Sequence, residues 1–381
     1  SAPKDATQLF YVYADKSGII STNQPKITGD SSIEKFFVAK VGTTMYSSLS
    51  DAVAAAGTGN TVTLLKDITI SERVEILQDI VLELNGKTLT GSTKGASSSL
   101  LVKNNAILTV QDSSDSKTGK IAANEYGIAA FNGATVIMKS GTIEANYAAL
   151  SGNNTAGDMN FIVEGGTLTS KQSEAIYMPG QVSLKVNGGT INGGISTRMG
   201  QITVTGGTIN GMTGNCDPIS EYYDYSGSAW IGDAIYVLAG TYNSANEEFG
   251  NTANITISGG TINGNSQYGV AIYRIGTGPA QNVNLNISGG KFSGTKGAVA
   301  VVSDGFEHTG ECNTETHQSA APEKVTANVN IYAGYFTSSP EESYIASGKT
   351  VSNSDLDGYT YMVGPKAEDD IDFVVTDSTS T

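Results

Sequence analysis

The sequence predicts an all-β protein, a right-handed parallel β-helix in which about nine coils of three short strands form a solenoid. Three observations predict this fold. One pattern of strand, glycine-containing pair and short strand recurs along the chain. Its strands alternate apolar and polar residues, so each has one face suited to a core. Glycine, 46 of 381 residues, recurs at the corners and shows no third-residue period, which excludes collagen.

The repeat is clearest in copies such as FIVEGGTLTS, LKVNGGTING and ITISGGTING, which begin at Phe161, Leu184 and Ile255. In the last copy, Ile255 and Ile257 alternate with polar residues, so we expect both isoleucines to face inward. The spacing between glycine pairs is uneven. A solenoid accommodates such differences, because insertions loop out at one corner without disturbing the stack.

The pattern divides the chain into five segments. We expect a leader over residues 1–36, an N-terminal cap over 37–78, the β-helix over 79–338, a C-terminal cap over 339–365 and an acidic Ser/Thr linker over 366–381. Three insertions interrupt the β-helix, at 212–232, 241–251 and 303–324.

A short helix is predicted within the N-terminal cap. Ser47–Ala56 begins with residues that cap helices and is followed by Gly57. Leu49, Val53 and Ala56 share one face of it, so we expect the helix to plug the N-terminal end of the stack, which would otherwise expose core and strand edges.

The charge excludes several classes of partner. The formal net charge is −15, and only Arg73, Arg198 and Arg274 are arginines. An acidic surface without a basic stripe repels phosphate backbones, so we expect no nucleic-acid partner. No stretch approaches the ~18–20 apolar residues that a membrane helix needs, so we expect no membrane insertion within this chain. We expect a monomer.

Several segments resemble the β-helix regions of large Gram-positive cell-surface proteins. Val41–Ile76, Asp79–Gly91 and the serial GGTI turns are similar to the opening and body of such regions, and Gly334–Val351 is similar to their closing cap. The resemblance implies an extracellular protein, secreted or attached to the cell wall through flanking sequence, with an adhesin-like role. The broader fold also resembles that of pectate lyases and polygalacturonases, which are enzymes.

No catalytic signature accompanies this resemblance. The Asn-Thr-Asp, Asp-Asp and Gly-His-Gly motifs of polygalacturonases are absent from the β-helix segment, and the one Asp-Asp lies at Asp369 in the tail. Pectate lyases use Asp-bound Ca²⁺ and an arginine base, so Ca²⁺ is expected only if the chain is a lyase. Arg198, Arg274 and Asp304 are candidates for that arrangement, but an arginine near an aspartate on a solenoid is more often a surface ion pair. We otherwise expect no cofactor.

Binding residues are expected in the insertions, because function on solenoids concentrates in loops on a rigid scaffold. Aromatic and acidic side chains gather in the first two insertions: Glu221, Tyr222, Tyr223, Asp224, Tyr225, Trp230 and Tyr242. Aromatic rings offer sugars a flat platform and suit protein interfaces. The alternative is that these rings only pin the loops to the solenoid.

Cys216 and Cys312 lie in the first and third insertions. A disulfide between them suits an exported protein. Free thiols are the second possibility, and a zinc site with His308 and His317 is the weakest, because the spacing matches no strong zinc motif.

An aromatic ladder is predicted within the third strand of each coil. Aligned by pattern, Phe131, Tyr177, Tyr236 and Tyr273 occupy one column, which Val301 continues. An outward ladder would be a stripe for stacking glycans, and an inward one part of the core. Small residues two positions earlier favour the core.

Three functions remain open. The first is a surface β-helix that displays loops for adhesion to a glycan or to a host or matrix protein, and we favour it. The second is a polysaccharide lyase or glycoside hydrolase. The third is a passive structural spacer in a larger surface protein.

Overall fold

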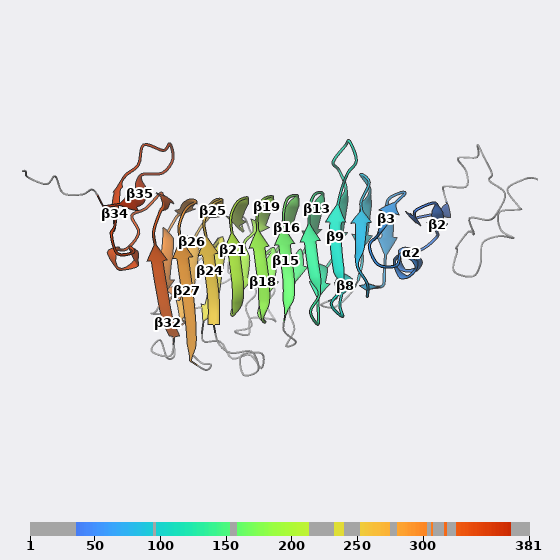
Figure 1. Ribbon diagram of the computed structural model, residues 1–381, viewed down its shortest axis with the longest axis horizontal. Helices are drawn as coiled ribbons and strands as arrows, with labels where there is room; N and C mark the ends of the chain where they lie inside the picture. Colours follow the sequence, from blue (N-terminus) through green and yellow to red (C-terminus); the bar gives the residue numbers. More distant parts are fainter. Residues whose placement is uncertain are drawn as a thin grey trace, which may run out of the picture.

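The computed structural model describes residues 36–93, 97–152, 158–212, 232–239, 252–274, 280–302, 306–307, 316–317 and 325–366. Within them, short strands stack into three long sheets that run the length of the molecule (Figure 1). Each coil passes from sheet 1 to sheet 2 to sheet 3, and the next coil lies about 4.8 Å further along. The predicted right-handed parallel β-helix is confirmed.

The sheets are defined by their strands. Sheet 1 contains β1 (Ala39–Val41), β2 (Thr44–Tyr46), β3 (Asn60–Leu64), β6 (Ile80–Glu83), β9 (Ile107–Gln111), β12 (Thr135–Met138), β15 (Met159–Val163), β18 (Val182–Val186), β21 (Gly200–Val204), β24 (Thr252–Ile257), β27 (Gln281–Ile287) and β32 (Val325–Ile331). Sheet 2 contains β4 (Ile68–Ile70), β7 (Thr88–Gly91), β10 (Lys120–Ala123), β13 (Thr142–Ala145), β16 (Thr167–Ser170), β19 (Thr190–Gly193), β22 (Thr208–Gly211), β25 (Thr261–Gly264), β28 (Lys291–Gly294), β33 (Gly334–Phe336), β34 (Lys349–Asn353) and β35 (Tyr361–Pro365). Sheet 3 contains β5 (Val74–Ile76), β8 (Ser98–Val102), β11 (Tyr126–Ala130), β14 (Leu150–Ser151), β17 (Ile176–Met178), β20 (Ile195–Thr197), β23 (Ile235–Ala239), β26 (Tyr268–Arg274) and β29 (Gly297–Val302).

The coils are counted over the described residues. Nine coils have all three strands, from β3-β4-β5 to β27-β28-β29, and β32 with β33 begins a tenth. The parallel stack starts at Asn60, where β3 pairs with β6, ahead of the Asp79 at which the repeat pattern placed the first coil. The corner between β3 and β4 contains no glycine, so the pattern of glycine pairs does not reveal this coil.

The core fills the space between the three sheets. Ile255 and Ile257 of β24 are buried in it while Thr256 between them is exposed, as the alternation predicts. The same alternation holds in the neighbouring coils, so branched aliphatic side chains stack in columns along the solenoid axis.

The glycine pairs between sheets 1 and 2 are required for two different reasons. A Cβ on the first glycine would meet a carbonyl oxygen of the preceding coil; for Gly206 this is the oxygen of Asn187, at 2.6 Å. The second glycine has a positive φ, 81° at Gly207 and 87° at Gly260, which side chains disfavour. Coils therefore approach more closely at this corner than any larger residue permits.

The predicted helix caps the N-terminal end. α2 spans Leu49–Ala55, and the Ser48 hydroxyl accepts a hydrogen bond from the Asp51 N–H at 3.1 Å. Leu49, Val53 and Ala56 are buried in the main core, which confirms the apolar face. Among the described residues, no helix is long and apolar enough to cross a membrane.

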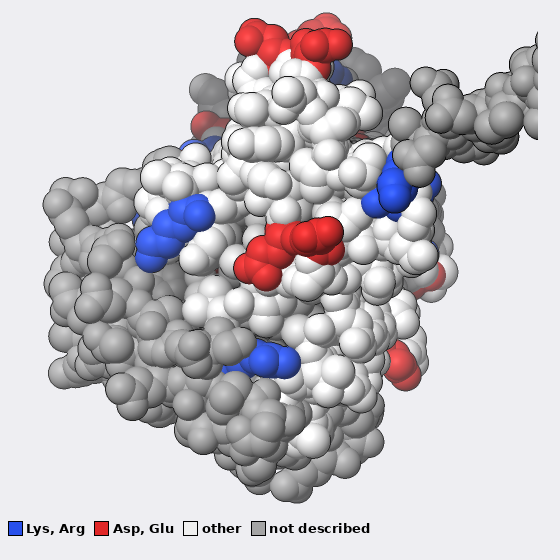
Figure 2. Space-filling model, turned by 90° about the vertical axis from the view of Figure 1, so that its left-hand side faces the viewer, with Lys and Arg blue, Asp and Glu red and all other residues white. Residues whose placement is uncertain are grey.

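The C-terminal end is covered by the 3-10 helix η3 (Glu342–Tyr344) and by β34 and β35, which extend sheet 2 in antiparallel fashion beyond β33. Seen from this end, the described surface carries scattered charged side chains on largely uncharged ground (Figure 2). The Tyr344 hydroxyl accepts a hydrogen bond from the Val301 N–H at 3.1 Å, so the cap also satisfies a donor of the edge strand β29.

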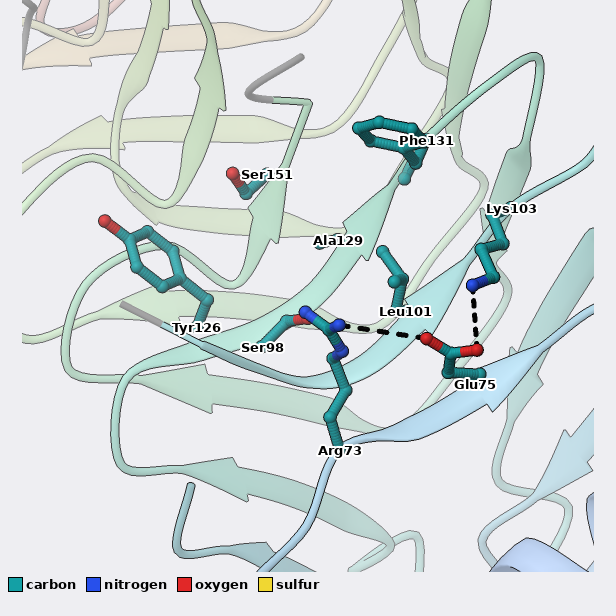
Figure 3. A pocket seen from close by; sticks show the side chains of 10 residues that line it. Arg73, Glu75, Ser98, Leu101, Lys103, Tyr126, Ala129, Phe131 and Ser151 are labelled. Carbon is teal, nitrogen blue, oxygen red and sulfur yellow. Dashed lines mark ion pairs between the residues drawn. The ribbon is translucent and has the colours of Figure 1, made fainter. Parts of the chain in front are cut away.

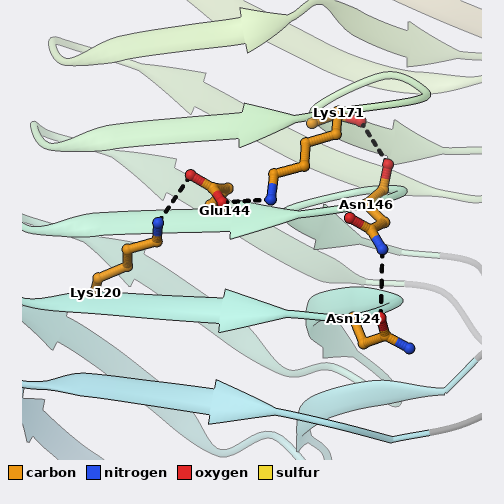
Figure 4. Close-up of polar contacts among 6 residues, drawn as sticks. Lys120, Asn124, Glu144, Asn146 and Lys171 are labelled. Atoms are coloured by element: carbon orange, nitrogen blue, oxygen red, sulfur yellow. Dashed lines mark hydrogen bonds and ion pairs between the residues drawn. The ribbon is translucent and has the colours of Figure 1, made fainter. Parts of the chain in front are cut away.

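Polar ladders run along the outer face of sheet 2. The amide of Asn210 donates to Asn192 at 2.9 Å and accepts from Asn263 at 2.8 Å. Further toward the N-terminus, Glu144 lies between Lys120 and Lys171, with oxygen–nitrogen distances of 2.9 and 2.7 Å (Figure 4). Side chains of adjacent coils thus satisfy one another on this face.

Candidate binding site on the outer face of sheet 3

The outer face of sheet 3 carries a hollow over its first four coils. Strand alternation builds it: Ile128 and Ala130 of β11 enter the core, so Ala129 between them faces outward. Register places Glu75, Leu101, Ala129 and Ser151 in one outward column, because β5, β8, β11 and β14 pair in parallel. Leu101 and Ala129 thus form the floor between a charged end and a hydroxyl end.

The hollow encloses about 390 Å³. The residues that line it are Arg73, Glu75, Ser98, Leu101, Lys103, Tyr126, Ala129, Ala130, Phe131 and Ser151. Figure 3 shows Glu75 and Lys103 on one side with Phe131 next to Lys103, and Tyr126 on the other side.

Three charged groups form the first wall. The Lys103 Nζ lies 2.8 Å from one carboxylate oxygen of Glu75, and the Arg73 Nη2 lies 3.8 Å from the other (Figure 3). The hydrogen bond from Lys103, with the positive charges of both basic residues, lowers the pKa of Glu75. Glu75 is therefore an ionised partner at neutral pH.

Aromatic side chains lie at the two ends of β11, Phe131 in register with Lys103 and Tyr126 on the far side of the hollow (Figure 3). Phe131, directly after β11, is 37% exposed. Tyr126 stacks on Tyr147, with ring centroids 5.6 Å apart and planes inclined by 28°. Burial, with the nearby negative charge of Glu174, raises the pKa of Tyr126 to about 12. Its phenol therefore remains a hydrogen-bond donor throughout the physiological range.

A buried hydroxyl also lines the hollow. Ser98 is only 3% exposed, and its Oγ has no hydrogen-bond partner in the structure. The Ser99 Oγ is buried without a partner in the same way, so the two hydroxyls are a feature of β8 and not a ligand contact. The aromatic rings, the apolar floor and the charged wall together make the hollow suitable for a polar ring compound.

The residues of the aromatic ladder lie on this face as well, so the ladder is not part of the core between the sheets, although two of its tyrosines are buried. Tyr236 and Tyr273 are 1% exposed, but they belong to a second cluster outside the main core, together with Leu238 and Ala271. Ile235 and Ile272, which directly precede these two tyrosines, fill the core instead. Small residues two positions away did not discriminate the faces, because residues i and i−2 share a face.

The predicted column is also out of register. Tyr177 and Tyr236 share a column through Ser196, whereas Tyr273 pairs with Leu238, and Val301 faces the other way, next to Ile272. A shift by two residues preserves the inward–outward pattern, so sequence alternation cannot detect it.

Two buried carboxylates border this second cluster. Asp233 is fully buried and accepts hydrogen bonds from the Tyr273 hydroxyl at 2.6 Å and the Tyr268 N–H at 2.8 Å. Glu174 accepts from the hydroxyls of Ser173, at 2.5 Å, and Tyr236, at 3.3 Å. Burial raises the pKa of Asp233 to about 7, against these hydrogen bonds. Both acids are enclosed and hydrogen-bonded, which is what a structural role requires.

Arg198 is not the surface residue that the sequence suggested. It directly follows β20, it is 4% exposed, and its Nε and Nη2 have no hydrogen-bond partner in the structure. None of the ion pairs between described residues includes it.

The binding residues predicted in the insertions lie outside the described residues. These are Glu221, Tyr222, Tyr223, Asp224, Tyr225, Trp230 and Tyr242. The disulfide candidates Cys216 and Cys312 and the metal candidate His308 also lie outside the described residues. The backbone of His317 is described and pairs with Phe306 in a two-stranded sheet of β30 (Phe306–Glu307) and β31 (Thr316–His317). The described part of the chain contains no group of three His, Cys, Asp or Glu residues suited to a metal ion. The insertion hypotheses therefore stay predictions.

Sequence reasoning missed the hollow. Its residues come from four coils. In the first two coils, whose third strands are β5 and β8, the repeat pattern did not identify the third strand. One signal was available, because Arg73 directly precedes β5 and Phe131 directly follows β11. That both residues line one hollow, however, depends on the register between the strands, which the sequence does not show.

No family model matches this sequence, and neither the curated proteins nor the solved structures gave a match. The functional argument therefore depends on the fold and on the hollow.

Proposed function

We propose that this chain is an extracellular binding protein, a rigid β-helix that holds a glycan on the outer face of sheet 3. The observation that supports this most directly is the hollow, where Phe131 and Tyr126 accompany a charged wall and an apolar floor. Ligand sites combine apolar surface with a few polar groups that fix orientation. Aromatic rings suit the apolar faces of sugar rings, and hydroxyls and charges suit their hydroxyl groups.

The solenoid gives such a site a rigid base. The floor residues Leu101, Ala129 and Ser151 are fixed one strand spacing apart by the backbone ladders of sheet 3. An extended chain that runs along the axis would therefore meet side chains at regular intervals. Tyr177, in register with Ser151 on the next coil, continues this surface beyond the hollow.

The insertions belong to the same proposal. The chain leaves sheet 2 at Gly211 and enters sheet 3 at Ile235, and it leaves sheet 3 again at Ala239 and at Val302. The described strands that flank the three insertions thus include β23 and β29 in the C-terminal half of sheet 3, whereas the hollow occupies its N-terminal half. We propose that the insertions contribute further adhesive contacts, separate from the hollow. The proposed location at the cell surface is supported only by the resemblance of the sequence to β-helix regions of Gram-positive cell-surface proteins.

Phe131→Ala tests the proposal. The protein is screened against a panel of neutral and acidic glycans, and the best ligand is then titrated into the variant by calorimetry. We expect Kd to rise on the order of tenfold, because loss of an aromatic contact costs about 0.5–1.5 kcal/mol beyond the buried area. Tyr332→Ala is the matched control, since Tyr332 is 42% exposed on the last coil, far from the hollow, and should leave Kd unchanged.

Two outcomes contradict the proposal. Either no glycan of the panel binds the folded chain, or Phe131→Ala and Tyr332→Ala both bind as the unaltered protein does. Recovery of a protein ligand that is insensitive to Phe131→Ala would move the function to the insertions.

A further inference from the structure

We infer that the glycan held in the hollow carries a carboxylate, and that Arg73 is the residue that recognises it. The inference rests on the proposed function and adds the chemical class of the ligand. It is based on the guanidinium group of Arg73, whose N–H donors make no hydrogen bond within the described residues.

The guanidinium of Arg73 lines the hollow with its donors unused. Its nearest acidic oxygen, on Glu75, is 3.8 Å away, beyond hydrogen-bond range, and within the described residues its side chain makes no hydrogen bond. Lys103 holds the other oxygen of the same carboxylate at 2.8 Å. Glu75 is thus committed to Lys103, while Arg73 keeps a planar fork of N–H groups whose geometry matches a carboxylate.

The charge of the wall favours an anion. Arg73 and Lys103 face one ionised acid, Glu75, so the lining has one more positive charge than negative. The chain as a whole has a net charge of −15. A positive site on an acidic protein concentrates anionic ligands locally, and the surrounding negative charge disfavours anions elsewhere on the surface.

The remaining lining identifies the anion as part of a sugar rather than a small inorganic ion. Phe131 and Tyr126 present rings, and Leu101 and Ala129 present an apolar floor (Figure 3). An inorganic anion would leave the rings and the apolar floor without contacts. A sugar acid has a ring face, hydroxyl groups and a carboxylate on one body, and so satisfies all three parts of the hollow.

Arg73→Gln tests the inference by calorimetry with four probes. Sialyllactose has its carboxylate on a terminal sugar, and a hyaluronan oligosaccharide has carboxylates within the chain; lactose and a chitin oligosaccharide are neutral. We expect the acidic probes to bind the unaltered protein more tightly than the neutral ones. Arg73→Gln should weaken the acidic probes about tenfold or more, in line with the strength of charge-assisted hydrogen bonds, and leave the neutral probes unchanged.

Lys185→Gln is the control for charge. Lys185 is exposed on β18 in sheet 1, so this variant loses the same charge away from the hollow and should bind all probes normally. Because Arg73 is a surface residue, Arg73→Gln is expected to fold, and an unchanged thermal melt verifies this. Which acidic probe responds distinguishes a terminal carboxylate from one within the chain.

The results separate the two proposals. If neutral probes bind as tightly as acidic ones, or if Arg73→Gln binds acidic probes normally, the carboxylate inference is wrong while the glycan-binding function stands. If no probe binds, both are wrong.

Discussion

At the scale of single residues, two buried aspartates show how burial and hydrogen bonds shift the pKa of a carboxyl group in opposite directions. Burial raises the pKa of Asp233 to about 7, so this side chain is still largely protonated in mildly acidic solution. Asp112 is the opposite case. Burial raises the pKa of Asp112 too, but hydrogen bonds from Ser114, Gly119 and Gly86 outweigh it and lower the pKa.

The pKa of Asp233 makes stability depend on pH. Below about 4, the usual pKa of an aspartate, Asp233 is protonated in both the folded and the unfolded chain. Between about 4 and 7 only the unfolded chain ionises, so the free energy of unfolding falls as pH rises. Asp233→Asn stays neutral and removes this fall. We expect denaturant melts of the variant, measured from about pH 4 to pH 7, to show a flatter profile than the unaltered protein.

Asp112→Asn is the control for this prediction. Because the pKa of Asp112 is lowered, its contribution is present at neutral pH and is lost as pH falls through the folded-state pKa. Its substitution should therefore cost most at neutral pH and least in acid. Parallel pH profiles for Asp233→Asn and the unaltered protein would contradict the account of Asp233.

At the scale of elements, the corner between sheets 1 and 2 is the most constrained part of a coil. Gly206 has no room for a Cβ because the Asn187 oxygen lies 2.6 Å from where that atom would be. We expect Gly206→Ala to lower the free energy of unfolding by about 1–3 kcal/mol, as forced overpacking does. Gly364→Ala is the comparison, since a Cβ there meets only a side-chain atom of Met362 at an ordinary 3.5 Å. Equal effects of the two substitutions in chemical denaturation would show that the corner is not tightly packed.

The element scale also shows what sequence can predict. Glycine pairs and alternating isoleucines predicted the strands of sheets 1 and 2, because each coil repeats the same steric demands at the same corner. Sheet 3 was predicted least well. β14 and β20 are two and three residues long, and slips of two residues keep every side chain on its face, so the aromatic register could not be derived.

At the scale of the whole molecule, the solenoid converts distant sequence positions into one surface. Arg73 and Ser151 are separated by most of three coils along the chain, yet both line the same hollow. A sequence can predict that such a surface exists, but which side chains meet on it depends on coil lengths and register. This is why the fold was predicted from the repeat while the candidate site emerged only from the structure.

The central claim is that a glycan occupies the hollow, and side-chain oxidation by hydroxyl radicals measures this most directly. Phe131, Tyr332 and Tyr335 are similarly exposed, at 37%, 42% and 38%, so they should be oxidised at comparable rates in the free protein. Saturation with the glycan selected by screening should protect Phe131 and leave both tyrosines unchanged. Protection of Tyr332 or Tyr335 with no change at Phe131 would contradict the claim.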